Sequence, residues 1–222
     1  MLTAKAIIER VRMNTYDKQE TGFTDEMLLG YINDGIRLLR RTILDVNPDL
    51  LADYDYITTL KAGENRVNLV ESSVNVTLSR VVDVRIDGHT VYQEDKRRIV
   101  DTTKEGEPFC YYMLGQSTIS VYPVPPEDVN VEVTGVKDQK LLTSIEEKTP
   151  LPSDVDDFLI EFVGIRAKMT DEFDLTQENS LFSSIIRQVE NYAMNLLPSG
   201  ITVDGVWDRP RIRRDYGRVE IL

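Results

Sequence analysis

Residues 117–174 decide the fold, and they read STISVYPVPPEDVNVEVTGVKDQKLLTSIEEKTPLPSDVDDFLIEFVGIRAKMTDEFD. Valines alternate with polar residues over positions 129–133, which predicts a half-buried antiparallel strand. A Pro-Leu-Pro run at 150–152 ends the β region, because proline cannot donate to a sheet ladder. Asp154 is expected to cap an amphipathic helix that follows. A single stretch therefore leads from sheet to helix.

Helical signals also lie at the start and near the end of the chain. A first helix is predicted over residues 4–14 with Thr3 as its cap, and a second over 25–45 with Thr24 as its cap. A further helix is predicted over residues 176–196. Each has an apolar stripe to bury, so the helices from both ends are expected to pack together as one bundle.

Two glycines interrupt the second predicted helix. Gly30 and Gly35 each cost about 1 kcal/mol of helix propensity. They indicate either the close approach of a neighbouring element or simple tolerance, and the sequence leaves both open.

Between the helices the apolar pattern has a period of two. Asp87-Gly88 lies between two alternating runs and is a strong hairpin signal. The predicted fold class is α+β: a helical bundle from the N- and C-terminal helices, an inserted small antiparallel β-sandwich or barrel, and an extended C-terminal arm. The expected division is bundle helices at 1–50, a β domain at 51–150, bundle helices at 151–198 and the arm at 199–222.

Composition argues against several functional classes. The net charge of −12 disfavours general binding to phosphate backbones or anionic membrane surfaces. The chain has a single cysteine, Cys110, which we expect to be buried and inert in a strand. No apolar run approaches the ~18 residues that span a bilayer, and the start of the chain lacks a signal-peptide pattern. A soluble, cytoplasmic protein without membrane contact is expected.

The residues of catalytic chemistry are sparse. The one histidine, His89, follows the hairpin glycine and is expected to be a turn residue. No phosphate-binding glycine motif occurs. Asp154, Asp156, Asp157 and Glu161 open the third predicted helix; a glycosidase pair or a divalent cation site is possible there, but complementing the helix dipole is the simpler interpretation. We therefore expect no catalytic residue, no metal and no cofactor.

The C-terminal segment differs from the body. With five arginines and three acids, residues 207–222 carry +2 against −14 for the rest. Stacking on single-stranded nucleic acid is one interpretation. A protein-binding arm suits an acidic body better, since Trp, Tyr and Arg dominate interfaces and an extended arm can add a strand to a partner's sheet. The expected binding residues are Trp207, Arg209, Arg211, Ile212, Arg213, Arg214, Tyr216, Val219 and Ile221.

Three strings carry a resemblance to a known family. They are LLGYINDGIRLLRR at 28–41, the hairpin VVDVRIDGHTV at 81–91 followed by PFCYYMLGQSTISVYPVPPEDVNVEVTGVK at 108–137, and LPSDVDDFLIEFVGIRAKMTDE at 151–172. Together with the order of elements, they resemble the head-to-tail connector (adaptor) proteins of tailed bacteriophages, of the short-tailed type. The resemblance implies a structural protein of the virion that assembles in the host cytoplasm.

The resemblance also implies partners. Adaptors of this kind form a ring, commonly of twelve copies, beneath the portal protein, with the C-terminal arm reaching the portal and the tail tube or nozzle following below. DNA passes through the lumen during ejection without specific binding, which suits acidic subunits. A virion-associated cell-wall glycosidase using the helix-three carboxylates, or a tail-terminator or tail-tube ring protein, is the alternative.

Overall fold

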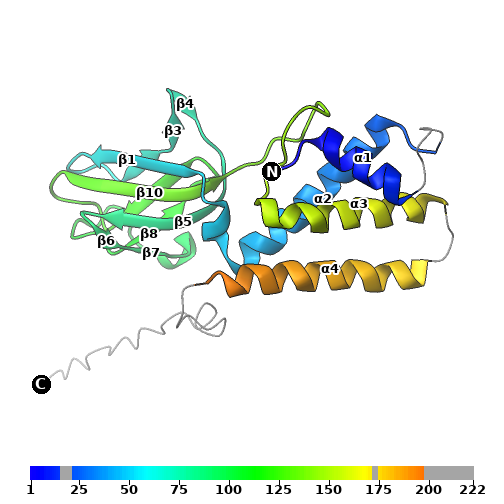
Figure 1. Cartoon of the computed structure of the whole chain (residues 1–222). Helices are drawn as coiled ribbons and strands as arrows, with labels where there is room; N and C mark the ends of the chain where they lie inside the picture. The colour runs from blue at the N-terminus through cyan, green and yellow to red at the C-terminus, as the bar shows by residue number, and fades with distance from the viewer. Residues whose placement is uncertain (16–21, 172–174, 198–222) are drawn as a thin grey trace, which may run out of the picture.

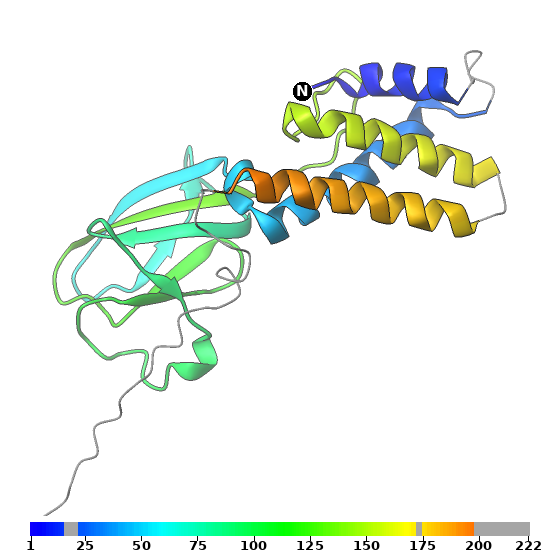
Figure 2. The ribbon, with the colours of Figure 1, turned by 60° about the horizontal axis from the view of Figure 1, so that its bottom comes forward.

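A computed structural model of the chain describes residues 1–15, 22–171 and 175–197. Four α-helices lie side by side at one end and a β insert forms the other, as both ribbon views show (Figures 1 and 2). The helices are α1 (Ala4–Asn14), α2 (Asp25–Val46), α3 (Asp156–Asp171) and α4 (Leu175–Asn195). The predicted α+β class, in which the N- and C-terminal helices pack together and antiparallel sheets are inserted between them in the sequence, is confirmed.

The two predicted N-caps of the first helices are confirmed. The Thr3 side chain accepts a hydrogen bond from the Ala6 backbone N–H at 3.3 Å, and Thr24 accepts one from Met27 at 3.2 Å. Each cap satisfies an N–H that has no partner within the first turn. The apolar stripes of all four helices meet in one core, whose fully buried members include Ile7, Leu28, Ile32, Leu39, Ile43, Leu159 and Ile185.

Gly35 marks the closest approach between α2 and α3. A Cβ placed on Gly35 would lie 2.5 Å from Leu159 Cδ1 and 2.8 Å from Phe162 Cδ1. A Cβ on Gly30, which is exposed on the same helix, would meet nothing within 4 Å. The close-approach interpretation therefore holds for Gly35, and tolerance holds for Gly30.

The third helix begins at Asp156, two residues after the expected cap. Residues Ser153–Val155 form a 3₁₀ turn, η3, and α3 starts at Asp156. The expectation that Asp154 caps the helix is wrong, because Asp154 lies inside this turn; its carboxylate accepts a hydrogen bond from the Tyr192 hydroxyl of α4 at 3.3 Å.

The insert consists of two four-stranded sheets and a small hairpin. One sheet has the order β1-β10-β5-β6 and the other β2-β9-β8-β7, while β3 pairs with β4. The strands are β1 (Tyr54–Leu60), β2 (Arg66–Asn68), β3 (Val70–Glu71), β4 (Val74–Asn75), β5 (Leu78–Ile86), β6 (His89–Thr90), β7 (Tyr92–Gln93), β8 (Cys110–Met113), β9 (Thr118–Tyr122) and β10 (Val129–Lys137). Two further 3₁₀ turns are η1 (Pro48–Leu51) and η2 (Lys96–Arg98).

The predicted hairpin and the alternating strand are both confirmed. Asp87 and Gly88 have φ values of 49° and 80°, and β5 and β6 pair across them in antiparallel register. These positive φ values suit the two-residue turn that matches strand twist. Strand β10 buries alternate residues and lies between β1 and β5. One pair departs from the antiparallel expectation, since β7 runs parallel to β8.

Two hydrophobic cores fill the molecule. The insert has its own core between its sheets, with Leu69, Ile119, Val121 and Val131 fully buried. Val136, near the end of β10, belongs instead to the helical core. The sheet therefore enters the bundle where β10 ends. In the part of the chain that the structure describes, no helix has both the length and the apolarity required to cross a bilayer.

Candidate functional site at the junction of bundle and insert

Arg40 joins α2 to the end of β10. It lies four residues after Ile36 and three before Ile43, so it sits on the buried side of the helix and is only 6% exposed. Its guanidinium donates from Nη2 to the Lys137 carbonyl at 2.6 Å and from Nη1 to Gln139 Oε1 at 3.4 Å. Burial lowers the pKa of Arg40, while the more distant carboxylates of Asp53 and Asp138 oppose this shift.

A second arginine holds the neighbouring strand to the same helix. Arg80 of β5 donates from Nη1 to the Leu44 carbonyl at 2.7 Å, in the last turn of α2. Its guanidinium also lies 3.7 Å from the Asp45 carboxylate. Because the last carbonyls of a helix have no partner within it, Arg80 satisfies one of them and attaches the sheet to the helix end.

The neck of the insert is closed where its two ends meet. The backbone N–H of Asp53 donates to the Gly135 carbonyl at 3.1 Å, and the Asp53 carboxylate accepts from the Lys137 backbone N–H at 2.7 Å. The chain thus enters and leaves the insert at the same place, beside the C-terminal end of α2.

After the neck, residues 138–149 lie along the bundle. Asn33 of α2 binds the backbone of Leu142 in both directions: its Nδ2 donates to the Leu142 carbonyl at 3.0 Å, and its Oδ1 accepts from the Leu142 N–H at 2.9 Å. Further on, the Glu147 carbonyl accepts from the Ala4 N–H at 2.9 Å. The returning segment therefore satisfies backbone groups at the start of α1.

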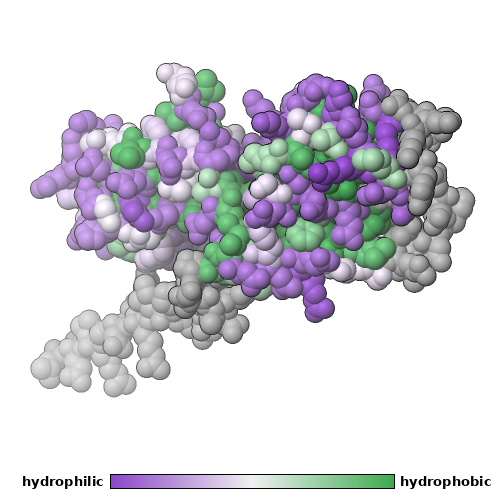
Figure 3. Space-filling model, viewed as in Figure 1, coloured by the Kyte–Doolittle hydropathy of each residue, from purple (hydrophilic) through white to green (hydrophobic). Residues whose placement is uncertain are grey.

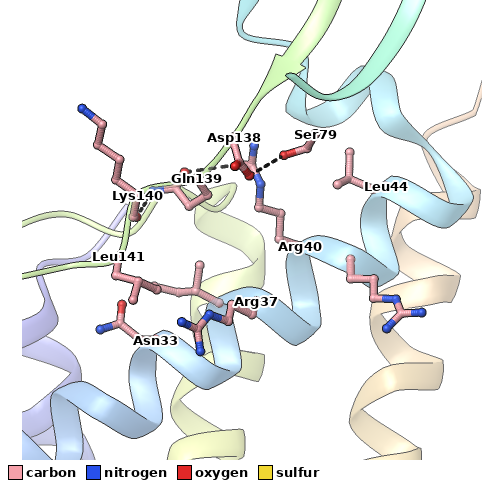
Figure 4. Close-up of a pocket in the computed structure, with 11 residues that line it drawn as sticks. Asn33, Arg37, Arg40, Leu44, Ser79, Asp138, Gln139, Lys140 and Leu141 are labelled. Carbon is pink, nitrogen blue, oxygen red and sulfur yellow. Dashed lines mark hydrogen bonds between the residues drawn. The ribbon is translucent and has the colours of Figure 1, made fainter. Parts of the chain in front are cut away.

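A pocket of about 240 Å³ lies between α2 and residues 138–141. Its charged lining consists of four cations and one acid: Arg37, Arg40, Arg41, Lys140 and Asp138. Figure 4 shows Arg40 reaching from the helix toward the segment that leads out of β10, with the Lys140 side chain pointing outward and Ser79 bonded to Asp138. Cations outnumber acids four to one in this lining, although the chain as a whole carries −12.

The rim cations of this pocket have weak acidic neighbours. Arg37 lies 3.3 Å from Asp34 and Arg41 lies 4.0 Å from Asp45, both as exposed pairs along α2. Exposed pairs of this kind are worth roughly 0–1 kcal/mol, so they leave the rim able to attract another anion. Leu141, which is 44% exposed, adds an apolar edge.

The predicted carboxylates of the third helix have different surroundings. Asp156 is buried and accepts from the Leu2 N–H and the Thr149 hydroxyl, both at 2.9 Å. Asp157 is exposed and lies 3.4 Å from Arg10, and Glu161 is exposed on the helix. Within the described ranges, no group of three or more His, Cys, Asp or Glu residues is arranged to hold a metal ion.

The other singled-out residues have structural positions. His89 was expected to be a turn residue, but it is the first residue of β6, directly after the hairpin glycine, where it is exposed. Cys110 is buried in β8, and its thiol donates to the Tyr122 carbonyl at 3.6 Å. The nine expected arm residues, from Trp207 to Ile221, lie outside the described residues.

Arg40 is not among the functional residues predicted from the sequence, although its position in α2 indicates burial. Its spacing from Ile36 and Ile43 places it on the apolar stripe of α2, where a long charged residue is unusual. In the space-filling view most of the visible surface is hydrophilic, and apolar residues gather where the insert meets the bundle (Figure 3). The junction thus combines buried charge with exposed apolar surface.

Comparison with known protein families gives a match over most of the chain. A family model described as SU10 adaptor protein matches residues 2–209, which includes both the bundle and the insert. No curated protein matches the chain.

Proposed function

This chain belongs to the SU10 adaptor protein family, a family of phage adaptor proteins, and from that premise we propose that it forms the ring that joins a phage head to its tail. The observation that carries the proposal is the extent of the family match, which covers nearly the whole chain. The ring lies beneath the portal protein, commonly as twelve copies, and leads the DNA channel into the tail tube or nozzle. The protein acts as a structural part of the virion, assembled in the host cytoplasm, and not as an enzyme.

The charge of the body supports a role as a channel wall. Residues 1–206 carry −14, so a ring of such subunits surrounds the lumen with excess negative charge. Like charge repels the phosphate backbone, and DNA then slides through without a binding site holding it. Asp156 is engaged with Leu2 and Thr149, while Asp157 and Glu161 are exposed on the helix surface, so these carboxylates give the glycosidase alternative little support.

The C-terminal arm is the proposed portal-binding element. Its arginines, Trp207 and Tyr216 are residue types that dominate interface hot spots. The β-branched Ile212, Val219 and Ile221 suit an extended strand that adds to a partner's sheet. In this proposal the chain divides into bundle helices at 1–50 and 151–198, the insert at 51–150 and the arm at 199–222.

Electron microscopy of the chain mixed with its portal tests the proposal. We expect a ring added below the portal, and no added ring would refute the adaptor role. A ring that binds tail components but never the portal would identify a tail-tube or terminator protein instead.

Two variants test the arm. Deleting residues 203–222 is expected to abolish portal binding, because the deletion removes all nine proposed contact residues. Trp207→Ala is expected to weaken portal attachment without changing the melting temperature of the body. Unchanged portal binding by the deletion variant would show that the arm assignment is wrong, and a large fall in melting temperature for Trp207→Ala would make Trp207 a core residue.

A further inference from the structure

Arg40 is a buried cation without a carboxylate at ion-pair distance among the described residues. Its two hydrogen-bond partners are a carbonyl and an amide oxygen, both neutral. Asp53 and Asp138 influence it only from further away. A buried charge is costly unless a counter-charge and hydrogen bonds compensate it. The guanidinium therefore has an unused capacity for an anion.

The pocket gives an anion access to Arg40. Arg41 and Lys140 stand at its rim, and their side chains are exposed. Ile36, Leu44 and Leu141 supply apolar wall between the cations. A carboxylate on a short aliphatic stem matches this lining, since the stem packs on the apolar wall and the oxygens reach the guanidinium.

We propose that this pocket binds an exposed Asp or Glu side chain of the neighbouring copy in the ring, with Arg40 as the anchor. The inference rests on the proposed ring. A closed ring of more than two copies uses two different surfaces of each subunit, so a cationic pocket on one surface requires an acidic partner on another. The chain supplies that partner abundantly, with 38 acidic against 26 basic residues.

DNA is a poorer fit to the same pocket. Duplex binding relies on many phosphate contacts spread along a basic stripe. Here the cations gather around one hollow of about 240 Å³ on a strongly acidic chain. A carboxylate from a second copy can occupy the pocket by itself. Duplex DNA at the same place would also bring its phosphates against the acidic surface of the chain.

The first test measures ring assembly on the portal with full-length variants. Arg41→Gln removes an exposed rim cation and Arg40→Gln removes the anchor, while Arg85→Gln is the matched control, because Arg85 is an exposed cation of β5 paired with Asp83 at 2.8 Å. We expect the concentration for half-maximal ring formation to rise about ten-fold or more for Arg40→Gln, and less for Arg41→Gln. The control is expected to match the wild type.

Failure of this inference is distinguishable from failure of the proposed function. If the wild type forms no ring, the proposed function is wrong. If the wild type forms rings and Arg41→Gln assembles like Arg85→Gln, the pocket is not the interface, whatever Arg40→Gln does to folding.

The second test identifies the occupant. A photo-crosslinking amino acid at Leu141, which lies at the pocket edge, should capture an acidic peptide of a second copy in assembled rings. Capture of DNA, of the portal, or of nothing overturns the proposal.

Discussion

The contact at Gly35 gives the sharpest prediction for stability. In Gly35→Ala, the added methyl group must fit where Leu159 and Phe162 already lie, at 2.5 and 2.8 Å from the new Cβ. Both side chains are buried, at 0% and 7% exposure, so they have little room to move. Overpacking of this kind typically costs about 1–3 kcal/mol.

Gly30→Ala is the matched control in the same helix. It gains the same helix propensity, about 1 kcal/mol, and its Cβ meets nothing. Because the propensity gain is common to both variants, it cancels in their comparison. Gly35→Ala should therefore be less stable than Gly30→Ala by about 1–3 kcal/mol, the overpacking cost alone.

Thermal and urea unfolding followed by far-ultraviolet circular dichroism measures the difference, since the signal reports mainly on the helices. For a chain of this size, each kcal/mol shifts the melting temperature by about 2–4 °C. We expect Gly30→Ala to melt above the wild type and well above Gly35→Ala. If Gly35→Ala were stabilised as much as Gly30→Ala, the close approach of α2 and α3 at this position would be refuted.

The remaining predictions concern two carboxylates that hold backbone. Asp156→Ala leaves the Leu2 N–H and the Thr149 hydroxyl without their buried acceptor, which should destabilise the fold by about 1–3 kcal/mol, whereas Asp157→Ala removes only an exposed pair and should cost under about 1 kcal/mol. Equal melting temperatures for the two variants would contradict the burial of Asp156. The pKa of Glu147 is lowered, chiefly by the hydrogen bond from the Thr143 side chain, so its stabilising contribution is present above the ordinary carboxyl pKa of about 4.3 and is lost as pH falls through the lowered value. The difference in melting temperature between wild type and Glu147→Gln should therefore shrink below about pH 4; a difference that is constant with pH would count against this.

Local patterns predicted the elements well, because caps and turns depend on neighbours in the chain. Thr3, Thr24 and the Asp87-Gly88 hairpin are all determined by the residues within a few positions of them. Alternation in β10 likewise reports burial on one face of a sheet, whichever strand lies beside it.

What could not be predicted depends on contacts between distant residues. Asn33 meets Leu142 across 109 positions, and nothing near either residue announces the pairing. The burial of Asp156 is similar, since the groups that bond its carboxylate, the Leu2 N–H and the Thr149 hydroxyl, lie outside its own helix. The helical spacing of Arg40 from Ile36 and Ile43 predicts that it is buried. The pocket beside it could not be predicted, because residues 138–141 form its other wall.

The closed neck at Asp53 has a consequence for how the chain folds. Helices α2 and α3 pack together, yet the whole insert lies between Val46 and Asp156. If the insert closes its own sheets first, the bond from Asp53 to Gly135 shortens the loop joining the two helices about four-fold. Loop-closure entropy changes by about 0.6 kcal/mol for each doubling of length, so early closure lowers the entropic cost of pairing the helices by about 1 kcal/mol. In that order of events the closed insert brings the ends of α2 and α3 close together, and the bundle is the last part of the subunit to form.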